Sequence, residues 1–82
     1  MKVKKFEELQ SNNSLLTDQE WVDLVNKFIK YFRKHLRIGQ SYMVALNDIR
    51  PDLYNKISGT DNDPFYDDDK LLNFIKFLNG EI

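Results

Sequence analysis

The feature that most constrains the fold is an apolar face repeated at helical spacing over residues 18–36. Its members recur every three or four residues, which places them on one side of a helix: Trp21, Leu24, Val25, Phe28 and Phe32. Thr17 and Glu20 have the spacing of a capping box, which marks the start of this helix. No segment alternates with the period of two that is typical of a strand. We therefore expect an all-α fold.

Three shorter helical segments follow the long one. The apolar spacing and the positions of glycine and proline predict helices over residues 40–49, 51–57 and 70–79. We expect Gly39 to end the long helix in a left-handed conformation and Pro51 to occupy the first turn of the third helix. The expected fold is a small bundle of about four helices, with an aspartate-rich loop at residues 60–69 before the last one.

A length of 82 residues bounds the chain to one domain. We expect a single helical domain over residues 17–82, preceded by an N-terminal segment, residues 1–16, whose order the sequence leaves open. The chain has no cysteine, no apolar core of a secretory leader and no apolar run near the length of a membrane helix. These features predict a cytoplasmic protein without a membrane partner.

The residue types speak against an enzyme and against a metal protein. The chain has one histidine and no cysteine, and no nucleophile with a base at a suitable spacing is recognisable. The loop aspartates could attract a hard cation, but a calcium loop that began at Asp61 would need glycine at position 66 and glutamate at position 72. Tyr66 and Leu72 stand there instead. We expect no catalytic residue, metal or cofactor.

The aromatic residues of the second half suggest a surface for a protein partner. Aromatic side chains with a charged rim are typical of interfaces, and the predicted surface consists of Asp63, Pro64, Phe65, Tyr66, Phe74 and Phe77. The alternative is that these rings are simply core. The partner would be a host or viral protein, or a second copy of the chain. We also expect a structural clasp of Arg37, Gly39 and Gln40, in which Arg37 or Gln40 bonds loop carbonyls or an aspartate such as Asp63.

A basic face on the long helix offers a second interpretation. It comprises Lys27, Lys30, Arg33, Lys34 and Arg37, with Tyr31 nearby. Such a stripe could follow the phosphates of a nucleic acid, although a solvated helix face has the same composition. The net charge of −1 does not favour nucleic acid over other partners. A nucleic-acid-associated protein is therefore the alternative to a protein-interaction module.

The second half also resembles a known family. The pattern reads Arg-x-Gly-Gln, then Pro-x-Leu-Tyr, then Gly-Thr-x-x-Asp-Pro-Phe-Tyr before a phenylalanine-rich helix, over about residues 37–78. It is carried by Arg37, Gly39, Gln40, Leu46, Pro51, Leu53, Tyr54, Gly59, Thr60, Asp63, Pro64, Phe65, Tyr66 and Phe74. In this pattern the chain resembles a family of short uncharacterised proteins of bacteriophages and their bacterial hosts. The resemblance implies a small phage accessory protein in the host cytoplasm, and no particular activity.

Overall fold

The computed structural model of this chain describes residues 14–81. Over that range it is all-helical, with four α-helices and one short 3₁₀-helix. They are α2 (Asp18–Phe32), α3 (Ile38–Ile49), α4 (Pro51–Ile57), η1 (Asp68–Lys70) and α5 (Leu71–Leu78). The predicted all-α bundle of about four helices is confirmed for this part of the chain.

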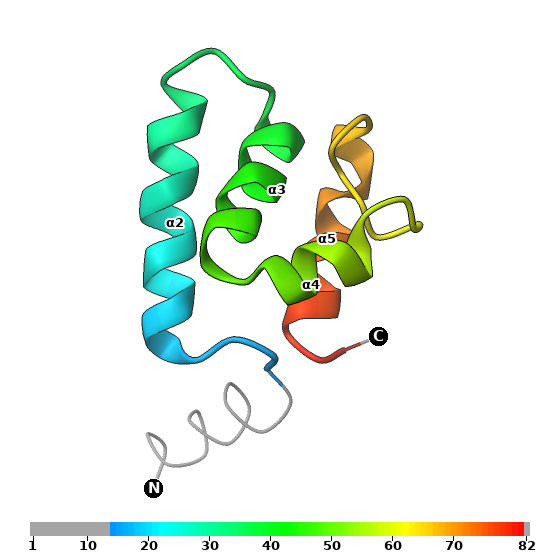
Figure 1. Cartoon of the computed structure of the whole chain (residues 1–82). Coiled ribbons are helices and arrows are strands. Elements are labelled where there is room, and N and C mark those ends of the chain that lie inside the picture. The colour runs from blue at the N-terminus through cyan, green and yellow to red at the C-terminus, as the bar shows by residue number, and fades with distance from the viewer. Residues whose placement is uncertain (1–13, 82) are drawn as a thin grey trace, which may run out of the picture.

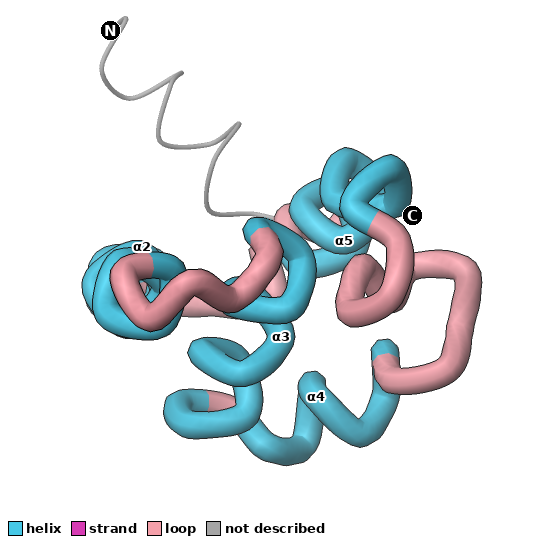
Figure 2. Tube along the Cα trace, turned by 90° about the horizontal axis from the view of Figure 1, so that it is seen from above, coloured by secondary structure: helices cyan, strands magenta, loops and turns pink. Residues whose placement is uncertain are grey.

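Helix α3 occupies the middle of the bundle. Figure 1 shows α2 running alongside α3 in the opposite direction, with α4 turning away at the end of α3. Seen from above in Figure 2, α2 and α5 lie on different sides of α3, and α4 forms the remaining side. The chain that enters α2 is tied to the end of α5, because the Leu15 amide donates to the Leu78 carbonyl over 2.8 Å.

The capping box predicted at the start of α2 is confirmed. The Glu20 amide donates to Thr17 Oγ1 over 3.1 Å, and the Thr17 amide donates to Glu20 Oε1 over 2.9 Å. Two amides that the helix itself leaves without partners are thus satisfied reciprocally. Leu16, the last residue of the predicted N-terminal segment, is buried in the core. Residues 1–13, most of the predicted N-terminal segment, lie outside the described part of the chain.

The end of α2 differs from the prediction. The helix stops at Phe32, and the left-handed residue that reverses the chain is His35, with φ of 71°, not Gly39. Histidine tolerates this conformation better than most side chains, and the turn is held by a hydrogen bond from the His35 amide to the Phe32 carbonyl (3.0 Å). Gly39 lies inside α3. Gly39 therefore does not end the long helix, and its conformation there is helical.

The starts and ends of the later helices lie closer to their predicted positions. Pro51 starts α4, and Gly59 and Gly80 adopt positive φ angles of 81° and 79° just after α4 and α5. The last helix begins one residue later than predicted, after the 3₁₀ turn η1. In that turn the Asp67 side chain accepts from the Asp69 amide over 2.9 Å. The loop aspartates thus cap backbone amides, as aspartates before a helix commonly do.

The core is built around α3 and is apolar apart from Ser41. Ser41 is fully buried, and its hydroxyl donates to the Arg37 carbonyl over 2.8 Å, which satisfies the group within its own helix. The buried apolar side chains are Leu16, Leu24, Met43, Ala45, Leu46, Leu53, Ile57, Phe74 and Leu78. Tyr42 links α2 and α5, because the centre of its ring lies 4.0 Å from that of Phe28, on which it stacks, and 5.9 Å from that of Phe74.

Arg50 lies at the C-terminal end of α3 and joins it to other segments. It lies between α3 and α4 and reaches two other parts of the chain. Its guanidinium donates to both carboxylate oxygens of Asp52, over 2.9 and 2.8 Å, and to Glu20 and the Leu15 carbonyl, each over 3.2 Å. The hydrogen bond from Arg50 is the main reason that the pKa of Asp52 is lowered to about 2. A bidentate bond of this type holds the arginine in one geometry.

Replacing Arg50 should therefore weaken the fold. We expect Arg50→Ala to lower the free energy of unfolding by about 1–3 kcal/mol, since it removes charge-assisted hydrogen bonds and leaves Glu20 with less compensation. Urea denaturation followed by circular dichroism measures this. Lys56→Ala is the control, because Lys56 is exposed on α4 and forms no ion pair among residues 14–81. Equal midpoints for the two variants would contradict the role assigned to Arg50.

Candidate functional site

The loop between α4 and η1 is shaped by its own polar side chains. Both carboxylate oxygens of Asp63 are used, because the Gly59 amide donates to one over 2.8 Å and the Phe65 amide to the other over 2.9 Å. The Thr60 hydroxyl donates to the Ile57 carbonyl over 2.6 Å and accepts from the Asn62 amide over 3.2 Å. These Asx-type and threonine turns are local hydrogen bonds that shape the loop and join it to the end of α4.

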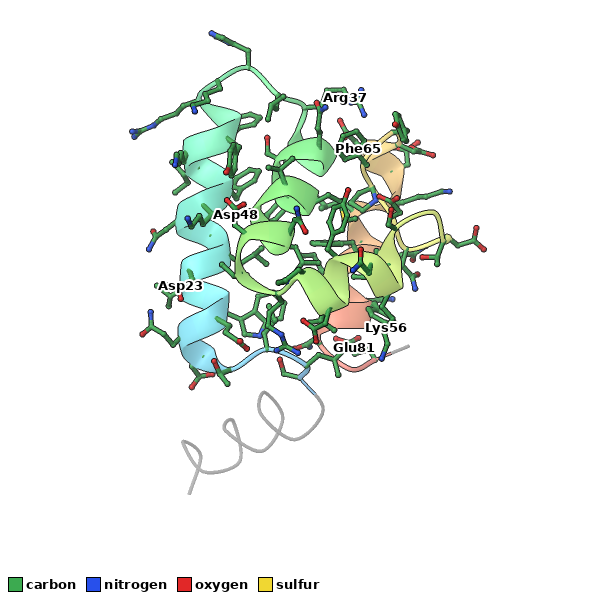
Figure 3. The ribbon with its side chains drawn as sticks, viewed as in Figure 1. Asp23, Arg37, Asp48, Lys56, Phe65 and Glu81 are labelled. Atoms are coloured by element: carbon green, nitrogen blue, oxygen red, sulfur yellow. The ribbon has the colours of Figure 1, made fainter. Side chains whose placement is uncertain are left out.

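The clasp fastens this loop to the start of α3. Arg37 Nη2 donates to the Phe65 carbonyl, and Arg37 Nε lies 3.8 Å from Asp68 Oδ1. The same Asp68 oxygen accepts from the Gly39 amide over 3.0 Å. Figure 3 shows Arg37 and Phe65 facing each other at one end of the molecule. The expected arginine-to-carbonyl contact is present.

Two details of the predicted clasp differ. Its carboxylate is that of Asp68, because Asp63 is already occupied by two loop amides. Gln40 is half-buried on α3, and its side chain forms no hydrogen bond within residues 14–81.

Gly39 is required because the loop backbone comes too close for a side chain. A Cβ atom at position 39 would overlap the Pro64 carbonyl oxygen and lie 2.8 Å from Asp68 Oδ1. Glycine is the residue that permits such an approach of backbone to backbone. The sequence Asp63-Pro64-Phe65 is thus placed directly on α3, with Pro64 fully buried at the contact.

The six residues predicted as an interaction surface divide into core and surface. Phe74 is fully buried and Phe77 half-buried against the core, so the structure removes Phe74 and Pro64 from any exposed face. Phe65 is half-buried against the core, and its ring meets that of Tyr66 edge-on at 4.8 Å. Tyr66 is 85% exposed. The aromatic surface is therefore the tip of the loop rather than the whole of α5.

The basic residues do not form one continuous stripe. Because α2 ends at Phe32, Arg33 and Lys34 lie in the turn after it, and Arg37 belongs to the clasp. Lys27 lies at a contact between α2 and α3, where its Nζ is 3.9 Å from Asp48 Oδ2 and the Tyr31 hydroxyl donates to the same oxygen over 2.5 Å. That hydrogen bond is the main cause of the raised pKa of Tyr31.

The three remaining cations, Lys30, Arg33 and Lys34, are exposed, and two of them share an aromatic neighbour. The ammonium groups of Lys30 and Lys34 lie 5.7 and 5.8 Å from the centre of the Tyr31 ring, within the range of cation–π attraction.

Sequence reasoning missed a second exposed apolar surface, on α2. Its residues are each between 41% and 52% exposed, although they lie on a helix whose other side is core: Val22, Val25, Ile29 and Phe32. The sequence analysis places Val25 and Phe32 on the same apolar face as Leu24, but the structure buries Leu24 and leaves the other two exposed. The signal was present in the sequence, because the apolar residues of α2 span about half the helix circumference, which is more than one neighbouring helix covers.

Membrane-spanning helices and metal-binding clusters are both absent from residues 14–81. No helix in this range is long and apolar enough to cross a membrane. No group of three or more histidine, aspartate or glutamate side chains in the described chain is placed to hold a metal ion. Comparison of the sequence and structure with known protein families, with curated proteins and with solved structures gives no match.

The tight approach at Gly39 leads to a paired prediction. Gly→Ala inside a helix ordinarily stabilises by up to about 1 kcal/mol, but here the overlap with the Pro64 carbonyl should reverse the sign. We expect Gly39→Ala to lower the free energy of unfolding by about 1–3 kcal/mol through overpacking. Chemical denaturation measures the change.

The matched control is Gly59→Ala, in the same loop region. A Cβ atom there meets nothing within 4 Å, so only the positive φ of 81° opposes it, at a cost of roughly 1–2 kcal/mol. The two substitutions are distinguished by their effect on hydrogen exchange in the loop. Gly39→Ala should also raise amide hydrogen exchange at Phe65, and Gly59→Ala should not. Stabilisation by Gly39→Ala would show that the loop does not rest on α3.

Proposed function

We propose that this chain is a non-enzymatic protein-interaction module that binds a protein partner through the tip of the clasped loop. The observation that carries the proposal is the 85% exposure of Tyr66 on a loop whose backbone is fastened on two sides. A large aromatic side chain that is exposed to solvent contributes little to the stability of the fold, and no side chain of residues 14–81 covers this one. Tyrosine is also among the residues that most often dominate binding energy.

The clasp supports this proposal because it fixes the loop before any partner arrives. Binding through a mobile loop costs the entropy of ordering it, and a loop that is already ordered avoids that cost. Arg37 and Asp63 together hold the backbone of Phe65 from opposite sides, through its carbonyl and its amide. The Tyr66 ring is therefore presented from a fixed base.

The charges around Tyr66 indicate the chemistry of the partner. Asp61 and Asp67 are exposed on the same loop, and Asp69 is exposed in η1, which follows it. Acidic rim residues favour association with a basic surface and suppress acidic ones. We propose a partner with an apolar pocket edged by lysine or arginine. The resemblance to phage proteins supports a host or viral protein as that partner, and the host cytoplasm as the place of action.

Substitution of Tyr66 tests the surface directly. We expect immobilised Tyr66→Ala to lose a specific partner from bacterial lysate that the unaltered chain retains, with binding weakened at least about 30-fold, as for a hot-spot residue. The helical circular dichroism signal should be unchanged, because the ring is exposed. Leu72→Ala is the control, since Leu72 is 63% exposed on α5 outside the loop. Equal retention by both variants would sink the proposal.

A second candidate function is association with nucleic acid. The observation that favours it is the cluster of Lys30, Lys34 and the Tyr31 ring, since cations beside an aromatic ring suit a phosphate backbone with stacked bases. It is the weaker candidate, because Lys27 and Arg37 of the predicted face are engaged within the fold.

Salt dependence distinguishes this candidate from the first. Binding of a labelled single-stranded oligonucleotide should fall steeply between 50 and 200 mM salt, by about tenfold or more. Reversing the charges in Lys30→Glu/Lys34→Glu should abolish it while Tyr66→Ala leaves it intact. Oligonucleotide binding that is unchanged by the charge reversal would show that Lys30 and Lys34 do not bind nucleic acid.

A further inference from the structure

The exposed apolar residues of α2 follow the spacing of a helix-pairing seam. Val22, Val25, Ile29 and Phe32 are separated by three, four and three residues, which is the a/d spacing of a coiled coil. Each is between 41% and 52% exposed, and no helix of residues 14–81 packs over them. The side of α2 that faces α3 is different and carries Leu24. We call these four residues the α2 seam.

The seam contains both a hollow and a side chain that could fill it. Near its start, Trp21, Val22, Val25 and Asn26 line a shallow, almost wholly apolar hollow of about 320 Å³. Near its end, Phe32 is 49% exposed, and its ring is held by stacking on Phe28 at 5.4 Å. Knob-into-hole contacts of this kind pack paired helices. A single copy cannot bring its own Phe32 to the hollow, since about 15 Å of helix separates Val22 from Phe32.

The two ends of the seam carry opposite charges, and these match the charges of a second copy in only one orientation. Asp18 continues the seam toward the start of α2, and Arg33 follows directly after its end. Neither forms an ion pair within the described residues. In a parallel pair of α2 helices, like charges would meet at both ends. In an antiparallel pair, Asp18 of each copy meets Arg33 of the other.

We propose that two copies of this chain pair through the α2 seam, with their α2 helices antiparallel. Val25 lies opposite the partner's Ile29 near the twofold axis, and Phe32 enters the hollow beside Val22 of the other copy. The surface is separate from the Tyr66 loop, so a dimer presents two loop tips. The partner-binding proposal does not depend on this one.

The expected dimer is a weak one. Stable interfaces bury about 800 Å² on each partner, and one exposed face of a four-turn helix falls below that. Association should therefore depend on concentration, with dissociation in roughly the micromolar to millimolar range.

Sedimentation equilibrium of the full chain over a concentration series tests the pairing. The mass should rise from 9.8 kDa toward twice that value. Val25→Glu should hold the mass at the monomer value, because it places a charge in the centre of the seam. Leu72→Glu is the matched control, an exposed apolar residue on α5 exchanged for the same acid, and should still dimerise. A monomer at every concentration, or equal loss in both variants, overturns the proposal.

Two further experiments, a charge exchange and a crosslinking test, keep the proposal testable if Val25→Glu disturbs folding. Asp18→Lys and Arg33→Glu should each weaken dimerisation several-fold, and the double variant should restore it.

Because the chain has no cysteine, Asn26→Cys introduces a unique thiol beside the twofold axis, and a short bismaleimide should link two copies into covalent dimers. Asn55→Cys, exposed on α4, should not link. Failure of charge restoration contradicts the antiparallel orientation, and equal linking of both cysteines contradicts the seam.

Discussion

The approach of the loop backbone to α3 at Gly39 is the constraint on which the second half of the structure depends. Helix and loop come so close that the Pro64 carbonyl occupies the space of a side chain. Glycine allows this contact, and a charge-assisted clasp then closes over it from Arg37 and Asp68. The result is an irregular segment that is joined to α3 by several polar contacts, although it contains little regular hydrogen bonding. That is why the residue after Phe65 can be both exposed and fixed in place.

Helix α3 is bracketed by two arginines that do equivalent work. Arg37 is its N-cap residue and Arg50 its C-cap residue, and each reaches away from the helix to fasten a distant segment. Arg37 holds the loop before η1, and Arg50 holds α4 and the chain entering α2. A domain of this size buries a limited apolar core. Polar ties at both ends of its central helix compensate for that limit, because they restrain segments that the core alone would not.

Local rules predicted the parts of this fold that depend on neighbours in sequence. The capping box at Thr17, the helix start at Pro51 and the stop at Gly80 are confirmed, since each is decided within one helical turn. Apart from the end of α2, the failures concern contacts between distant residues. The close approach to Gly39 comes from Pro64, 25 residues away, and the carboxylate beside Arg37 is Asp68, because both oxygens of Asp63 accept from loop amides. Phe74 and Leu72 are both apolar residues of α5, and only the packing shows that the first is core and the second surface.

The distribution of exposed apolar side chains separates two surfaces with different physical character. Tyr66 is a single ring on a rigid acidic loop, which suits a pocket on an unlike, basic partner. The α2 seam is an extended stripe with opposite charges at its ends, which suits a surface like itself. In a domain short of core, apolar residues left at the surface weaken the fold relative to burying them. Four of the seven large apolar side chains that are exposed within residues 14–81 lie together in the α2 seam, and a fifth is Tyr66 on the clasped loop. These two surfaces are therefore the ones from which binding is proposed.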